Sequence, residues 1–107
     1  MSIIFYDHLV DKTEINIYIG TLDAPEETKS SLRQRLDDIL HHGILEHILQ
    51  KLHPHHHHTF LDALRRAPYD PQLLSYLKDH AAQDIEDSIA RHAKKLISEI
   101  ISDLKSS

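Results

Sequence analysis

The sequence predicts a mainly α-helical protein, built as an antiparallel bundle of about four helices. Apolar residues recur every three or four positions over long stretches, only two glycines and four prolines occur in 107 residues, and cysteine is absent. Low glycine and proline counts disfavour a chain with many tight turns, and short connections favour antiparallel neighbours. We expect one domain, residues 1–107, with residues 1–20 as an N-terminal hairpin or arm and 25–104 as the helical bundle.

The N-terminal segment, residues 3–19, has a different pattern from the rest. Ile15, Ile17 and Ile19 alternate with polar or aromatic residues, which is the period of a strand with one buried face. One interpretation is therefore a β-hairpin. The other is a short extra helix that is capped by Thr13 and ends at Gly20.

The longest helix is expected to open at Pro25 and to end near Leu52. Proline suits the first turn of a helix, and the residue before Pro54 disfavours helical geometry. Gly43 interrupts the segment and costs about 1 kcal/mol relative to Ala, so either another backbone packs closely there or the helix bends. The apolar positions of this segment are Leu32, Leu36, Ile39, Leu40, Ile44, Ile48, Leu49 and Leu52.

Three shorter predictions follow along the chain. Pro54 opens a second helix, and Asp70 caps a third whose first residue is Pro71. A bend is expected at 79–84, where large apolar residues are missing, before a last helix over roughly 84–104. The expected inward face of the second helix is Phe60, Leu61, Leu64 and Ala67.

Histidine is the most unusual component of the chain, with 11 residues, five of which lie within positions 53–58. Neutral imidazoles are good ligands for Zn, Ni or Cu. Because successive helical residues fan out by about 100°, the run cannot converge on one ion, but His55, His58 and Asp62 share one stripe. We therefore identify these three as candidate ligands of a histidine-based transition-metal binding protein. A solvated helix start without a site and a pH switch remain open as alternatives.

Composition disfavours several functions. The net charge is −5 and Lys and Arg are scattered, so we expect no nucleic-acid partner. No apolar stretch approaches the roughly 20 residues of a membrane span, and the first seven residues do not resemble a secretory signal, so we expect a cytoplasmic protein without a membrane role. There is no glycine-rich phosphate loop, nucleophile elbow or cysteine, so we expect no enzymatic activity.

The remaining hypothesis is a non-enzymatic module for protein–protein interaction or self-association. Leu45, Ile97 and Ile101 lie at the edges of their apolar stripes and are candidate contacts for a protein partner or within a homo-oligomer. Packing in the core of the same chain is the alternative for each of them. Among the other histidines, Asp37 with His41 has the spacing of a helical ion pair.

A family resemblance rests on helix starts and leucine spacing. In order along the chain stand Gly20-Thr21-Leu22, Pro25-Glu26-Glu27, a long helix, Leu52, Pro54, Phe60-Leu61, Asp70 and a terminal helix. This order resembles a family of small bacterial all-helical domains of unknown function, over about residues 20–104. The resemblance implies a compact helical domain without a known active site. The histidines at 55–58 and the segment 3–19 depart from the family, which implies that the histidine run belongs to this sequence rather than to a shared function.

Overall fold

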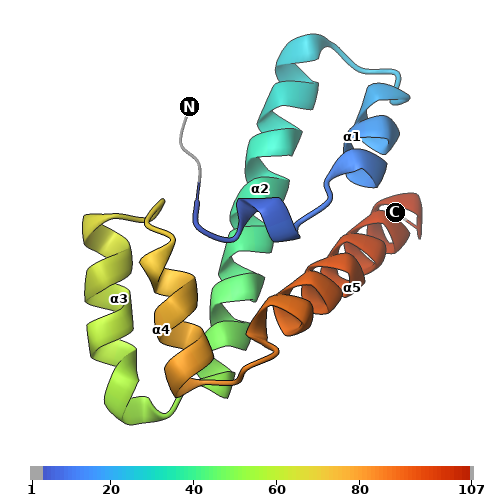
Figure 1. Ribbon diagram of the computed structural model, residues 1–107. Helices are drawn as coiled ribbons and strands as arrows, with labels where there is room; N and C mark the ends of the chain where they lie inside the picture. Colours follow the sequence, from blue (N-terminus) through green and yellow to red (C-terminus); the bar gives the residue numbers. More distant parts are fainter. Residues whose placement is uncertain (1–3, 107) are drawn as a thin grey trace.

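The computed structural model describes residues 4–106, and this part of the chain is mainly helical, without a strand (Figure 1). Its α helices are α1 (Thr13–Gly20), α2 (Glu26–Lys51), α3 (His57–Arg66), α4 (Gln72–His80) and α5 (Ile85–Ser106), and its single 3-10 turns are η1 (Asp7–Leu9) and η2 (Pro54–His56). The long helix α2 is central. In Figure 1, α1 lies beside one end of α2 and the α3–α4 pair lies at the other end, while α5 starts beside the lower half of α2 and extends towards α1.

Helix α1 occupies the place of the second arm of the predicted hairpin. Ile15 and Ile19, four residues apart, are buried, whereas Ile17 between them is 62% exposed. The three isoleucines therefore follow the helical period, and the helix satisfies its backbone hydrogen bonds locally, which an isolated hairpin could do only in part. The hairpin does not form in the described residues, and the alternative helix ending at Gly20 does. Ile3, where the first arm was expected to begin, lies outside the described residues.

Prolines and short polar side chains set the other helix boundaries. Helix α2 begins directly after Pro25 and ends before Leu52, close to the predicted limits. The carboxylate of Asp70 accepts the backbone N–H of Gln72 at 2.9 Å, but the N-cap of α4 is Pro71, one position after the predicted cap. The predicted bend at 79–84 is a complete break, because α4 ends at His80 and α5 begins at Ile85.

One apolar core runs along the facing sides of α2 and α5. Both helices bury a residue every four positions, which places those residues on one face of each helix. Phe60 packs edge-on against Phe5 and so joins α3 to the N-terminal segment. Leu61, predicted to face inward with Phe60, is more exposed than the rest of that set. The buried residues of the two long helices are Leu36, Leu40, Ile44, Ile48, Ile85, Ile89, Ala93, Ile97 and Ile101.

Gly43 lies on the side of α2 that faces α5, directly under the Leu96 side chain. A methyl group at Gly43 would lie 2.7 Å from Cδ1 of Leu96, so the close neighbour is a side chain and not the second backbone that was one of two predictions. His47 lies four residues after Gly43 on α2, and its contact His92 lies four residues before Leu96 on α5. His47 also contacts Ser88, one further turn back along α5. The two helices therefore run in opposite directions.

The molecule is elongated. Its radius of gyration is 15.1 Å and its extents are 46 × 25 × 20 Å, whereas a compact chain of this length would have a radius of about 13 Å. An elongated shape leaves a larger share of each helix uncovered. None of the helices described for residues 4–106 has the length and apolar character that a membrane crossing requires.

Candidate functional site

The predicted metal ligands are not brought together around a common point. His55 and His58 are exposed, and the carboxylate of Asp62 pairs with Arg66 at 2.9 Å. The His55 ring lies instead beside that of His53, with centroids 4.7 Å apart. Nowhere in the described part of the chain are three or more His, Cys, Asp or Glu side chains placed to hold a metal ion.

Two histidines of the run serve the ends of helices. Nε2 of His57 lies 2.7 Å from the carbonyl oxygens of both Leu49 and Leu52. Carbonyls can only accept, so the imidazole N–H donates to both and caps the end of α2. Nδ1 of His53 accepts the backbone N–H of His55 at 3.1 Å, at the start of η2. These contacts give part of the run a structural role.

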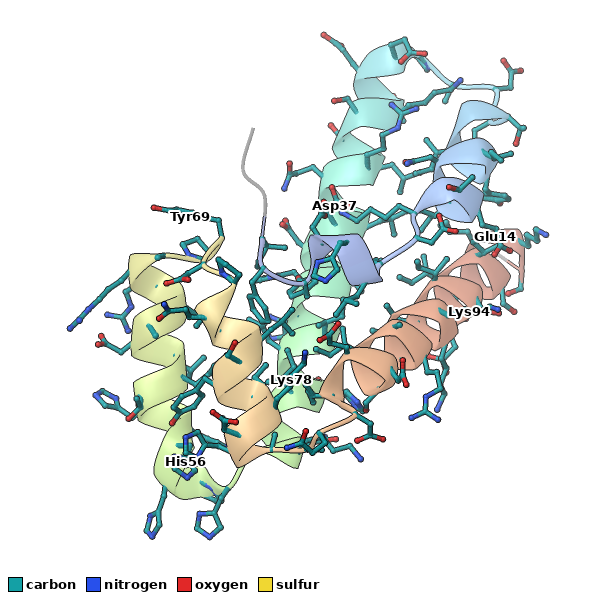
Figure 2. The ribbon with its side chains drawn as sticks, viewed as in Figure 1. Glu14, Asp37, His56, Tyr69, Lys78 and Lys94 are labelled. Atoms are coloured by element: carbon teal, nitrogen blue, oxygen red, sulfur yellow. The ribbon has the colours of Figure 1, made fainter. Side chains whose placement is uncertain are left out.

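A third histidine of the run, His56, reaches a different helix. Its Nδ1 is 2.9 Å from the hydroxyl of Tyr76, and its ring lies 4.4 Å from that of His80, centroid to centroid. Figure 2 places His56 at the end of the molecule where η2 meets α4. The contact joins the start of α3 to the end of α4.

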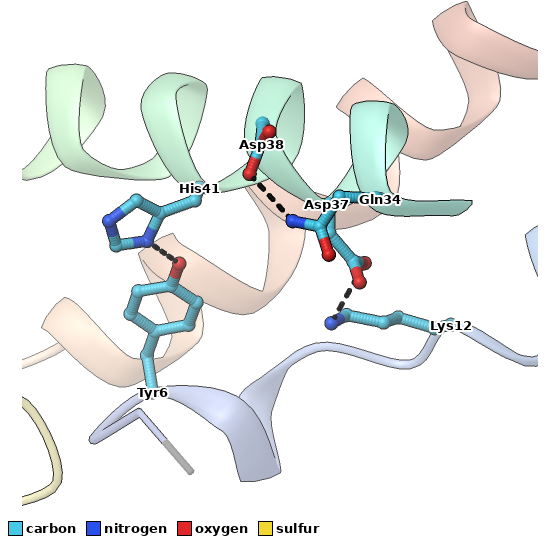
Figure 3. A network of polar contacts seen from close by, with 6 residues as sticks. All are labelled: Tyr6, Lys12, Gln34, Asp37, Asp38 and His41. Carbon is cyan, nitrogen blue, oxygen red and sulfur yellow. Dashed lines mark hydrogen bonds and ion pairs between the residues drawn. The ribbon is translucent and has the colours of Figure 1, made fainter. Parts of the chain in front are cut away.

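A second polar cluster lines a cleft of about 370 Å³ between the N-terminal segment and α2 (Figure 3). The Tyr6 hydroxyl is 2.5 Å from Nδ1 of His41, and Lys12 pairs with Asp37 at 3.2 Å. The predicted pair of Asp37 with His41 is therefore replaced by two contacts that cross to the N-terminal segment. Both contacts hold that segment against α2.

The chemistry of this cleft favours a structural contact. Burial, with the charges of Asp7 and Asp37 adding, raises the pKa of Tyr6 above its ordinary value. Burial and the neighbouring His42 lower the pKa of His41, against the opposing effect of Asp38. The phenol therefore keeps its proton and the imidazole stays neutral near pH 7, which suits a donor and an acceptor better than a proton-transfer pair.

The predicted contact residues lie inside the chain. Ile97 is 3% exposed and Ile101 is 6% exposed, and both belong to the core, while Leu45 is partly buried against it. A partner could therefore touch the two isoleucines only if α5 moved. The large apolar side chains that the structure exposes are Ile17, Ile39, Leu61 and Tyr69.

Ile39 belongs to a line of half-covered residues between the two long helices, which we call the open seam. Its members are Ile39, Gly43 and His47 on α2 and His92, Leu96 and Ile100 on α5. Gly43 faces Leu96, and His47 stacks on His92, with ring centroids 4.2 Å apart and planes within 10°. Ile39 and Ile100 lie one helical turn beyond Gly43 and Leu96, on α2 and α5 respectively. Ile39 is 48% exposed and the other members are partly buried, so the seam lacks a covering element in the described chain.

The sequence carries no local signal for these pairings. His47 and His92 are far apart in the sequence, on different helices, and neither lies in the histidine run. Helical spacing predicts contacts within one helix, whereas this contact depends on the direction and register of α5 against α2. Ile39, by contrast, was recognised as part of an apolar stripe, and only its exposure was unforeseen.

Comparison with known proteins identifies no relative. No protein-family model, no curated protein and no solved structure matches the chain. The resemblance to a bacterial helical family remains an expectation, and the function is inferred from the chain's own residues.

Proposed function

We propose that the chain is a non-enzymatic interaction module that self-associates through its open seam. The observation that carries the proposal is the exposure of Ile39, at 48%, in a line of half-covered residues between two long antiparallel helices. An exposed apolar side chain between two helices is a surface on which a further helix can pack in helical proteins. Packing there would remove apolar area from water, which is the main source of free energy in association.

A second copy is the occupant that needs the fewest further assumptions. A contact with two-fold symmetry requires only one patch, because each subunit presents the same surface to the other. Two copies joined seam to seam would place four long helices, α2 and α5 of each, around one apolar layer. Such a layer of four helices from two copies would be distinct from the bundle within one chain that the sequence pattern predicts.

The mass of the protein in solution tests the proposal. Light scattering after gel filtration, over roughly 1–100 μM, should show a rise from the 12.4 kDa of one chain towards twice that mass. Ile39→Glu should hold the protein at the mass of one chain, because it places a charge in the apolar contact. Since Ile39 is half exposed in the single chain, the substitution should leave the helical content unchanged.

Ile17→Glu is the matched control. Ile17 is also an exposed isoleucine on a helix, at 62%, but it lies on α1 away from the seam. We expect this variant to associate as the unaltered chain does. A constant mass of 12.4 kDa at every concentration would refute self-association, and association that survives Ile39→Glu would exclude the seam as its site.

A further inference from the structure

We propose that the stacked pair of His47 and His92 is a proton-sensitive clasp between α2 and α5 that loosens on mild acidification. The rings lie 4.2 Å apart, nearly parallel, and Nε2 of His47 is 2.7 Å from Oγ of Ser88. Both rings are partly buried, one on each of the two helices that share the largest contact in the molecule. The inference concerns the single chain and does not depend on self-association.

The stacked geometry suits two neutral rings. In parallel imidazoles the N–H groups and lone pairs lie in the ring planes, so those of His47 and His92 do not converge on a shared ion. A first proton gives a cation stacked on a neutral ring, which the pair can tolerate. A second proton gives two like charges in contact, which opposes the stack.

The contacts described around the pair, within residues 4–106, bring a positive charge and no ion pair to the two rings. Lys51, one turn further along α2, adds a positive charge beside His47. Among residues 4–106, no carboxylate forms an ion pair with either ring. Around the first turn of α5, Glu86 is engaged by Lys78 of α4, and His8 of η1 acts on that same carboxylate.

Burial, with the neighbouring His92 and Lys51 adding, lowers the pKa of His47 below its ordinary value. A histidine of this kind binds protons more tightly in the unfolded chain than in the folded one. Its contribution to stability is fully present above the unfolded pKa of about 6.5 and is lost as the pH falls from there through the folded pKa. The other members of the seam, Ile39, Gly43, Leu96 and Ile100, have no titratable side chain, so acid should loosen only the histidine end of the seam.

Thermal unfolding at two pH values tests the clasp. The midpoint Tm of the full chain should be lower at about pH 5.5 than at about pH 7.5, the range over which histidines titrate. His47→Gln keeps an amide that can bond to Ser88 but cannot take up a proton. We expect the difference in Tm between the two pH values to be smaller in this variant by a few degrees. The difference that remains should come from other histidines, such as His41.

His58→Gln is the control, because the His58 side chain is exposed and takes part in none of the side-chain hydrogen bonds, ion pairs or ring contacts described for residues 4–106. It should leave the Tm difference unchanged. The difference should also persist in Ile39→Glu, which separates the clasp from any effect of acid on self-association. A Tm difference that His47→Gln does not narrow would overturn the proposal.

A titration of the unaltered protein covers the case in which His47→Gln fails to fold. The imidazole resonances of His47 and His92 can be followed by NMR as the pH is lowered. We expect the His47 midpoint below the reference value of about 6.5. A midpoint at or above that value would also overturn the proposal.

Discussion

The two halves of α2 bury the same kind of core, yet different chemistry secures their edges. In the first half, Lys12 pairs with Asp37 at 3.2 Å, and Lys29 donates to the carbonyl of Gly20 at 3.1 Å, so fixed positive charges tie α2 to the N-terminal segment and α1. In the second half, His47 stacks on His92 and His57 caps the end of the helix. The edge contacts of the second half therefore use histidine imidazoles, whereas those of the first half use lysine ammonium groups.

The apolar core and the contacts at its edges should therefore respond differently to the pH and the salt concentration of the solution. The core residues of both halves are apolar, and their contribution should not change between pH 5 and 8. The edge contacts should respond to the solution, since salt screens fixed charges and pH sets the charge of imidazoles. The two halves should therefore be equally sensitive to core substitutions and differently sensitive to solution conditions.

The largest expected effect tests the shared core. Leu36→Ala in the first half and Ile48→Ala in the second each remove a buried side chain of similar size. Each should lower the free energy of unfolding by about 2–5 kcal/mol, through lost apolar burial and the cavity left behind. Urea unfolding followed by circular dichroism measures both losses, and each should be the same at pH 7.5 and at about pH 6.5.

The shape of these unfolding curves also tests whether the halves fold together. A single domain of this size should unfold in one transition, which both variants shift to lower urea. Two separate transitions, of which each variant moves only one, would mean that the halves are independent and would contradict the continuous core.

An intermediate effect is expected at Gly43, in the second half of α2. Gly43→Leu would force a large side chain against Leu96 and should destabilise the chain by about 1–3 kcal/mol. Gly43→Ala adds one methyl group 2.7 Å from the end of the Leu96 side chain, which is only partly buried and can turn away. Its cost should be offset by a gain in helix propensity of about 1 kcal/mol, so the net change should be small. Urea unfolding should show that the leucine variant loses more stability than the alanine variant. A large loss of stability in the alanine variant would show that the Leu96 side chain is held in place.

The features predicted from the sequence are those that neighbouring residues determine. The limits of α2 follow from Pro25 and Pro54, and the start of α4 follows from Asp70, because prolines and capping side chains act on the backbone beside them. The helical class follows from apolar residues spaced by three and four. These signals do not depend on where the rest of the chain lies.

The features that the sequence did not predict are of two kinds. Some depend on partners distant in the sequence, and others depend on a pattern that fits two structures. Isoleucines at 15, 17 and 19 satisfy a strand, and two of them also satisfy a helix, so the choice rests on what α1 packs against. The histidine run drew attention to residues 53–58, whereas the most parallel imidazole stack joins His47 to His92. That stack follows from the register of α5 on α2, which no local spacing encodes.

The smallest expected effect concerns the fixed charges of the first half. Lys12→Ala removes the pair with Asp37, and because both side chains are substantially exposed, the loss should be only about 0.2–1 kcal/mol. The loss should shrink further in about 1 M salt, where the screening length falls to about 3 Å. Lys94→Ala is a suitable control, since Lys94 is exposed and forms no ion pair among residues 4–106.

Urea unfolding at low and high salt, repeated at two pH values, separates the two kinds of edge. Salt should reduce the effect of Lys12→Ala, and acidification towards pH 5.5 should change it much less, because no histidine takes part in this contact. His47→Gln should respond in the opposite way, to pH more than to salt. If the stability lost in both variants changed with salt and not with pH, the histidine contact would behave as an ordinary surface charge. The distinction between the halves of α2 would then fail.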